Sequence, residues 1–184
     1  MRMLGFQGFE SHCSLLFKKL SDGFSNHRFP APRALSKAPP CATLGAMNCT
    51  ASDTKELIRL YYEAFNAGDR PGMLRLLAPG VVHDINQGAS VPGIEAFEKF
   101  LAHMDRCYAE QVEDLVVMAD ESGTRAAAEF YIRGEYLITD EGLPEAVGQK
   151  YHLRVGAFFD LTEGRIARVT NYYNLQDWIA QVGG

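Results

Sequence analysis

Four segments that alternate apolar and polar residues dominate the second half of this 184-residue chain. They cover residues 111–119, 124–139, 147–160 and 165–174, and turn sequences that contain glycine separate them. Alternation with a period of two is typical of β-strands that bury one face. Short turns between consecutive strands favour antiparallel pairing. The sequence therefore predicts a meander of four antiparallel strands.

Three helices are predicted ahead of this meander. The first begins near Asp53, where Glu56 three residues later completes an N-cap pair, and it ends at Asn66-Ala-Gly68. Asp69 and Pro71 suit the start of a short second helix. After a strand at 81–86, a third helix carries one apolar face, formed by Ile94, Phe97, Leu101, Met104 and Tyr108.

Helices followed by consecutive strands indicate the α+β class. We expect a cone-shaped, curved antiparallel sheet closed by the three N-terminal helices, which is a cystatin-like α+β barrel. A closing helical turn is expected at 175–182. Such a sheet buries its concave face against the helices, so we expect a conical pocket between the two layers.

The charge changes sign near Met47. Residues 1–46 carry a net charge of +4 and residues 47–184 a net charge of −9. Clustered prolines from Pro30 to Pro40 favour an extended linker. We expect residues 1–46 to be a disordered or targeting-like extension, or an over-long start, and residues 47–184 to form the domain. The acidic domain argues against nucleic acid, and the lack of a long apolar run argues against a membrane span. The expected location is cytoplasmic, or an organelle if the extension is a transit segment.

The strand at 81–86 carries the first candidate for chemistry. Alternation places Asp84 and Asn86 on one face with Val82, and His83 on the other. If the Asp84 face lines the pocket, desolvation raises the pKa of the carboxyl and suits it to take a proton from carbon. A surface or turn-capping role for Asp84 is the alternative.

Two further positions could bind or polarise a substrate. Tyr61 lies on the apolar stripe of the first helix, so its buried hydroxyl could donate to a developing oxyanion, or the ring could simply belong to the core. Arg133 and Glu135 share the polar face of strand 124–139. They either form an exposed ion pair or, if this face lines the pocket, contact the substrate.

Recognised metal and cofactor motifs do not occur in the sequence. The five histidines show no HxH or HExxH spacing, and the four cysteines form no CxxC pair. Glycine-rich nucleotide loops and a serine nucleophile motif do not occur either. Cys107 is interpreted as a small buried apolar residue. We therefore expect no metal and no cofactor.

Several segments together resemble the nuclear transport factor 2-like superfamily. They are Tyr61-Tyr-Glu-Ala-Phe-Asn-Ala-Gly-Asp69, Val81-Val-His-Asp84, Gly156-Ala-Phe-Phe-Asp-Leu-Thr-Glu-Gly-Arg-Ile166 and Val169-Thr-Asn-Tyr-Tyr-Asn174. The superfamily includes ketosteroid isomerase, SnoaL-type polyketide cyclases, scytalone dehydratase and limonene-epoxide hydrolase. The resemblance covers residues 53–182 and is strongest to ketosteroid isomerase-related proteins.

The resemblance to ketosteroid isomerase implies roles for two residues. Tyr61 falls where that enzyme has its oxyanion-hole tyrosine, and Asp84 falls where it has its general base. Gly156 stands where a protonated aspartic acid is expected, so one oxyanion donor is missing.

The resemblance to limonene-epoxide hydrolase involves a different set of residues. Arg133 and Glu135 resemble its arginine and acid, while Asn171 stands where an aspartate would activate water. Asp84 and Asn86 fall near its water-positioning pair. Phe158 and Trp178 complete the expected substrate-binding residues.

Three hypotheses follow from these residues and resemblances. The first is a cofactor-independent enzyme, an isomerase or cyclase, that moves a proton on a small hydrophobic carbonyl compound by means of Asp84 and Tyr61. The second is an epoxide hydrolase centred on Arg133 and Glu135. The third is a non-catalytic ligand-binding or dimerisation module, because a fold does not imply a function. A homodimer is expected, since aromatic and aliphatic residues on the convex face of the sheet need cover.

Overall fold

The computed structural model describes residues 49–183, so the predictions for residues 1–46 lie outside the described residues. The helices are α2 (Ala51–Asn66), α3 (Arg70–Arg75), α4 (Ile94–Cys107) and α5 (Leu175–Val182). The strands are β1 (Leu77–Asp84), β2 (Ser90–Pro92), β3 (Tyr108–Ala119), β4 (Arg125–Tyr136), β5 (Lys150–Thr162) and β6 (Arg165–Tyr173).

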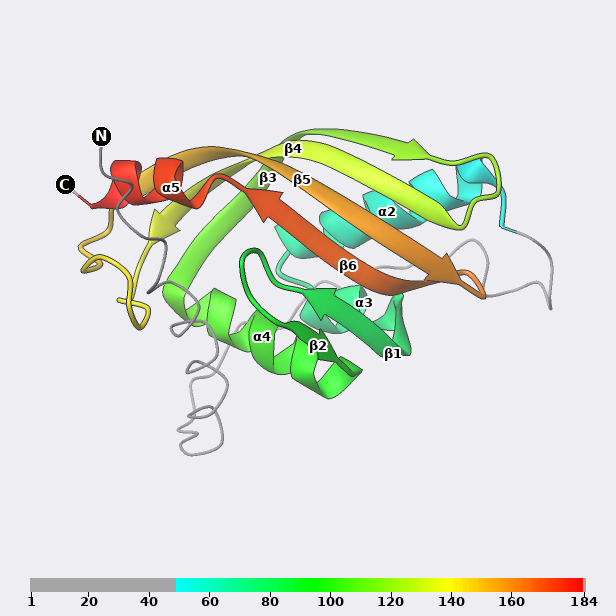
Figure 1. The fold of residues 1–184 in the computed structure, drawn as a ribbon, viewed down its shortest axis with the longest axis horizontal. Helices are drawn as coiled ribbons and strands as arrows, with labels where there is room; N and C mark the ends of the chain where they lie inside the picture. Colours follow the sequence, from blue (N-terminus) through cyan, green and yellow to red (C-terminus); the bar gives the residue numbers. More distant parts are fainter. Residues whose placement is uncertain (1–48, 184) are drawn as a thin grey trace, which may run out of the picture.

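The strands form one six-stranded sheet in the order β2-β1-β6-β5-β4-β3. The predicted antiparallel meander is confirmed for β3 to β6. The sheet as a whole is mixed, because β1 pairs with β6 in parallel and the short β2 pairs with β1. Figure 1 shows the long strands curving over α2, with α4 beside β1 and β2. The α+β class with a curved sheet closed by helices is confirmed. No helix within residues 49–183 is long and apolar enough to cross a membrane.

The first helix begins earlier than predicted. Thr50, not Asp53, is its N-cap, and the Thr50 hydroxyl accepts a hydrogen bond from the Asp53 amide at 3.2 Å. The Asp53 carboxylate in turn accepts from the Thr50 amide at 3.0 Å, which completes a capping box. Asp69 caps α3 as predicted, accepting from the Gly72 amide at 2.8 Å.

Helices pack on one face of the sheet and not on the other. We call the face that packs on α2 and α4 the inner face, and the opposite one the outer face. On β4, alternate residues from Ala126 to Tyr136 are buried on the inner face. Beneath α2 the rings of Tyr62, Phe130 and Phe159 are in contact, with centroids 4.8 Å apart for Tyr62 and Phe130. The interior under α2 is therefore an aromatic core.

One irregularity changes which residues of β3 face inward. The pairing of β3 with β4 shifts between Glu113 and Val116, where Asp114 adopts a left-handed backbone with φ 53°. Before the shift Val112 is buried, and after it Val117 is buried while Val116 is exposed. This bulge reverses the alternation within a single strand, which a strict period of two does not predict.

Candidate functional site

The inward side of β1 carries His83 rather than Asp84. Val81 and His83 are buried, at 0% and 2% exposure, because they pack towards α4. Because side chains alternate along a strand, the Asp84 side chain points to the opposite side, where it is 23% exposed. The Asp84 face is therefore not the inward one, and the alternative of a surface role for this carboxylate agrees with its position.

Three donors from neighbouring strands surround Asp84. Its carboxylate accepts from the Ser90 hydroxyl on β2, and from Arg168 Nη1 and the Thr170 hydroxyl on β6, both at 2.7 Å. Burial raises the pKa of Asp84, but these hydrogen bonds and the charge of Arg168 outweigh it and lower the pKa to about 2. The expected raised pKa is thus not found, and the carboxylate is a poor proton acceptor near neutral pH.

His83 has the environment that was expected for Asp84. Its ring contacts the rings of Phe97 and Phe100 of α4, with centroids 4.8 and 4.4 Å away. Burial lowers the pKa of His83 to about 4, against the opposing charge of Asp84. His83 is therefore a neutral imidazole near neutral pH, with one ring nitrogen that carries a lone pair instead of a proton.

Asn171 is the polar neighbour of this imidazole. Its Nδ2 lies 3.4 Å from His83 Nε2, and the half-buried side chain shares the inner face with Ala157. If the amide nitrogen donates, His83 Nε2 accepts and the ring proton is on Nδ1. The structure thus brings together His83, which was not among the predicted site residues, and Asn171, which was predicted as a substrate-binding residue.

Tyr61, Asn86 and Trp178 lie at other places. Tyr61 is buried, its ring lies edge-on to Phe159 with centroids 6.0 Å apart, and burial raises the pKa of its hydroxyl. Asn86 Nδ2 donates to the backbone carbonyl of Tyr173 at 3.2 Å. Trp178 is 4% exposed on α5 and packs on three inner-face tyrosines, Tyr108, Tyr136 and Tyr151. The roles given to these three residues stay predictions.

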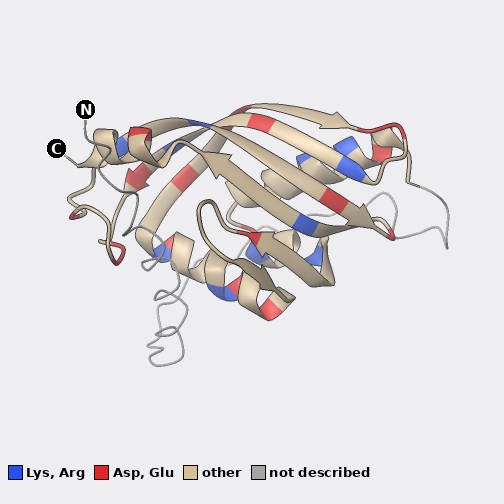
Figure 2. Cartoon of the chain, in the orientation of Figure 1, with Lys and Arg blue, Asp and Glu red and all other residues tan. Residues whose placement is uncertain are grey.

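Arg133, Glu135 and Phe158 belong to the outer face. The Arg133 side chain is 62% exposed and its Nε donates to Glu113 Oε1 at 2.6 Å, while Phe158 is 54% exposed. The alternative in which this face lines an internal pocket is therefore wrong, because the apolar residues of β4 are the buried ones. Figure 2 shows charges of both signs along these strands.

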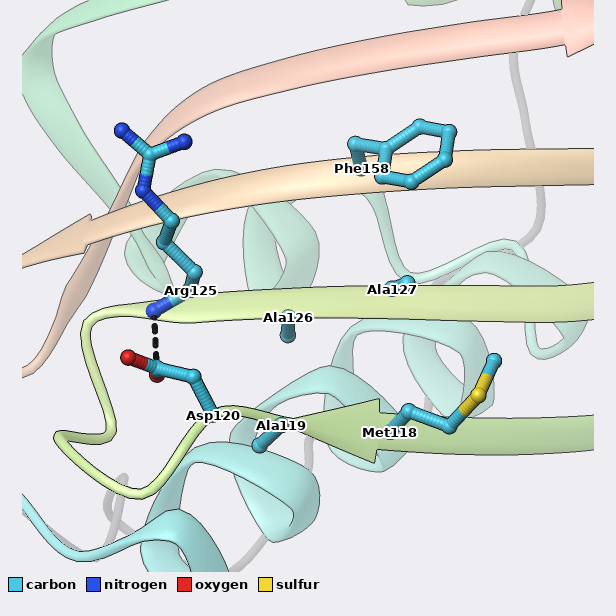
Figure 3. Close-up of a pocket in the computed structure, with 7 residues that line it drawn as sticks. All are labelled: Met118, Ala119, Asp120, Arg125, Ala126, Ala127 and Phe158. Carbon is cyan, nitrogen blue, oxygen red and sulfur yellow. Dashed lines mark hydrogen bonds between the residues drawn. The ribbon is translucent and has the colours of Figure 1, made fainter.

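An open pocket of about 230 Å³ lies at the end of the outer face. Figure 3 shows Met118 and Phe158 on either side of Ala127, with the Arg125 amide donating to Asp120 at one end. The conical pocket between sheet and helices stays a prediction.

A half-buried carboxyl that the sequence reasoning missed lies further along the inner face. Glu110 accepts a hydrogen bond from the Tyr151 hydroxyl at 2.7 Å, and burial raises the pKa of this carboxyl. Gly134 lies between the two residues in the cross-strand row. A Cβ at Gly134 would lie 2.2 Å from Tyr151 Cζ, so only glycine lets the ring cross β4 to reach Glu110. A glycine inside a predicted strand was the available signal for this close approach.

A second missed cluster lies where α4 ends. His103 Nε2 is 2.9 Å from Asp140 Oδ2 and 3.9 Å from Cys107 Sγ. These three ligand atoms all lie within 4.8 Å of one another, so the cluster could hold a metal ion. The spacing of His103 and Cys107 by four residues on one helix face was the signal in the sequence.

Comparison with known proteins identifies the family. The SnoaL-like domain matches residues 58–169, and the chain belongs to this family, as the resemblance predicted. No curated protein matches the chain. A candidate polyketide cyclase from Pseudomonas putida is 56% identical, covers 70% of this chain and 97% of its own, and superimposes with a TM-score of 0.69. Another candidate cyclase, from a Silicibacter species, is 50% identical, with 74% and 100% covered and a TM-score of 0.71.

A more distant structure shares the fold alone. An LEH-like epoxide hydrolase from M. tuberculosis is 14% identical, with 72% of this chain and 86% of that chain covered and a TM-score of 0.59. At this identity, the similarity carries no chemistry from that protein to this chain.

Proposed function

We propose that this protein is a cofactor-independent enzyme that transfers a proton on a small hydrophobic carbonyl compound, as a cyclase or isomerase does. The observation that carries the proposal is the neutral, buried imidazole of His83, held between two phenylalanine rings beside the Asn171 amide. The similarity to candidate polyketide cyclases at 50% and 56% identity supports it.

In this proposal His83 takes the proton from the carbon next to the carbonyl group. In the free protein the Asn171 amide lies against His83 Nε2. When substrate binds, this amide turns to donate to the carbonyl oxygen as negative charge develops there, which leaves Nε2 free to take the proton. Asp84 does not touch the substrate, but its charge stabilises the imidazolium that forms, since it already raises the pKa of His83 against the effect of burial. An imidazole of low pKa is a weak base, so the substrate class is carbonyl compounds with an activated C–H bond, such as β-keto esters.

The substrate reaches His83 from the side of Phe100 and Asn171. Both side chains are half-buried, whereas His83 and Phe97 are 2% and 3% exposed. Phe100 therefore separates the imidazole from solvent and has to rotate for a substrate to enter. The apolar walls formed by the two phenylalanines favour a hydrophobic ligand.

The test is exchange of the α-hydrogen of aryl β-keto esters for deuterium, followed by NMR. We expect His83→Gln to lower the enzyme-dependent rate by a factor of about 100 or more. Asp84→Asn should lower it by about tenfold, because it removes a stabilising charge but no reacting group.

Asp160→Asn is the matched control, since Asp160 also pairs with Arg168 but lies on β5 and is not next to His83. It should leave the exchange rate unchanged. Full exchange activity in His83→Gln would contradict the proposal, and so would an Asp84→Asn defect larger than that of His83→Gln.

The epoxide hydrolase hypothesis receives no support from the geometry. It needs Arg133 and Glu135 at the substrate, and both lie on the outer face, with Arg133 paired to Glu113.

We further propose that a second copy of the chain covers the outer face. Four large apolar side chains are exposed there, forming the outer patch: Val116, Met118, Phe158 and Tyr172, at 56, 49, 54 and 57% exposure. Cross-strand pairing holds them together, because Met118 and Phe158 both pair with Ala127 and the Phe158 and Tyr172 rings are 5.9 Å apart. A contiguous apolar surface of this kind marks an interaction site, and a homodimer is the simplest way to bury it.

A further inference from the structure

The cluster at the end of α4 joins two parts of the chain that are distant in the sequence. His103 and Cys107 lie one helical turn apart on α4, and Asp140 follows β4 in the connection to β5. All three side chains are well buried: Cys107 is 1% exposed, and the His103 and Asp140 side chains are 13% and 11% exposed. The proposed proton transfer at His83 uses none of them.

Backbone hydrogen bonds hold these three positions in place. The Cys107 carbonyl accepts from the amides of Leu137 and Ile138, at 2.8 and 3.3 Å, which ties the end of α4 to the chain that follows β4. The Asp140 amide donates to the Tyr136 hydroxyl at 2.6 Å. The backbone hydrogen bonds therefore hold the three ligand residues close together without a metal ion.

The carboxylate of Asp140 is also oriented from two sides. The Tyr108 hydroxyl donates to Oδ2 at 2.9 Å, and the Glu141 amide donates to Oδ1 at 2.9 Å. Partners of this kind around a ligand carboxylate fix its geometry and strengthen metal binding.

The distances fit one tetrahedral ion. Bonds of about 2.3 Å to sulfur and about 2.0 Å to nitrogen or oxygen place neighbouring ligand atoms roughly 3.3 to 3.6 Å apart. The His103–Cys107 separation of 3.9 Å and the His103–Asp140 separation of 2.9 Å lie on either side of this range. Small side-chain rotations would therefore admit the ion.

The electrostatics also favour a cation. Cys107 is the last residue of the 14-residue helix α4, where the negative end of the helix dipole stabilises positive charge. A thiolate and a carboxylate together neutralise a divalent ion. Against this, Arg106 Nη2 lies 3.1 Å from His103 Nδ1 and can only donate to it. Its side chain is exposed, so it can move away when Nδ1 takes up the proton that a metal displaces from Nε2.

We propose that His103 Nε2, Cys107 Sγ and Asp140 Oδ2 form a binding site for Zn²⁺, with a water molecule as the fourth ligand. Mixed sulfur, nitrogen and oxygen ligands in tetrahedral geometry suit zinc. On binding, the Cys107 thiol loses its proton to solvent. The His103 proton leaves Nε2, and a proton is taken up at Nδ1, so one proton is released in total. The ion clamps the end of α4 to the segment that follows β4.

Cobalt titration of the full chain tests this site. The protein is freed of metal with a chelator, reduced, and titrated with Co²⁺, and binding is followed by the near-ultraviolet absorption that a thiolate bound to cobalt produces. We expect one equivalent to bind with this band. Cys107→Ala should abolish the band, and Asp140→Asn should weaken the affinity by at least about tenfold.

Two controls separate this site from other thiols and histidines. Cys107→Ala keeps the three other cysteines, and His152→Gln removes an exposed histidine of the outer face and should bind as the unmodified chain does. Arg106→Gln should bind Co²⁺ at least as tightly, because it removes a cation beside His103. A titration without the thiolate band, or a band that persists in Cys107→Ala, would overturn the proposal. A titration of the unmodified chain without the band overturns the proposal by itself. If Cys107→Ala fails to fold, the weaker binding expected for Asp140→Asn, which keeps all four cysteines, assigns the band to this site.

Discussion

His83 and Asp84 are neighbours in the chain, yet their surroundings shift their pKa values by different means. Desolvation under α4 lowers the pKa of the imidazole, and donors from β2 and β6 lower that of the carboxyl. The alternation of β1 alone distinguishes the two environments. A shift of β1 by one residue would exchange them.

The stability of the fold should depend on pH through His83. Its pKa falls from 6.5 to about 4 on folding, so the unfolded chain binds the proton first. This contribution is complete above pH 6.5 and is lost as the pH falls towards 4, and it amounts to roughly 3 kcal/mol. Asp84 acts only at lower pH, because its pKa changes from 3.8 to about 2.

Urea unfolding of the native protein and of His83→Gln at a series of pH values measures this effect. The difference between the two proteins in free energy of unfolding should shrink from pH 6.5 to pH 4. A difference that does not change across this range would show that His83 is not buried as a neutral ring.

At this scale the sequence could not decide which side of β1 faces inward. Alternation separates His83 from Asp84, but both neighbouring faces contain apolar residues, Val81 on one and Val82 on the other. Packing against Phe97 and Phe100 settles the orientation, and these rings come from a helix ten or more residues further along the chain. Glu110 and Asp140 were missed for the same reason, since tertiary contacts give them their partners.

At the scale of elements, the end of α2 is tied to the edge of the sheet. Asn66 Nδ2 donates to the Val112 carbonyl at 2.9 Å, and its Oδ1 accepts from the Val112 amide at 2.8 Å. β3 is an edge strand, so the Asn66 amide takes the place of a neighbouring strand at this residue.

Replacing Asn66 should therefore destabilise the fold. Asn66→Ala leaves both backbone groups of Val112 without these partners and should lower the free energy of unfolding by about 2 kcal/mol. Asn66→Asp should cost at least as much, because a carboxylate cannot donate to the Val112 carbonyl. Denaturant unfolding measures both changes, with the exposed Glu63→Ala on the same helix as control. If Asn66→Ala lowered the free energy of unfolding no more than Glu63→Ala does, the two Asn66–Val112 hydrogen bonds would not stabilise the fold as proposed.

The elements with strong local signals were predictable. The helix periodicity, the Asp69 cap and the strands that became β3 to β6 follow from residues close in sequence. The mixed edge was not, because β2 has three residues and β1 includes Pro79 and Gly80, which indicate a turn. The parallel pairing of β1 with β6 joins segments from the two ends of the domain, and no local sequence pattern predicts such a pairing.

At the scale of the whole molecule, the two faces of the sheet carry different kinds of residues. The inner face holds the aromatic core and His83, while the outer face combines exposed ion pairs with the outer patch. The proposed dimer should depend on this patch. Phe158→Glu should shift the protein towards monomer in analytical ultracentrifugation, because two buried charges would meet the partner's apolar surface.

Val147→Glu is the matched control for this substitution. Val147 is 76% exposed in the connection before β5, away from the outer patch. It should leave the oligomeric state unchanged. A native protein that sediments as a monomer would contradict the dimer.

The pH dependence of α-hydrogen exchange tests most directly whether His83 is the proton acceptor. For the native protein, kcat/KM should rise with pH through an apparent pKa of about 4 and stay level to neutral pH, because the neutral imidazole is the active form. In Asp84→Asn the rise should move to lower pH, since the charge that raises the pKa of His83 is gone. The same rise in His83→Gln, with its rate undiminished, would contradict the proposed role of His83.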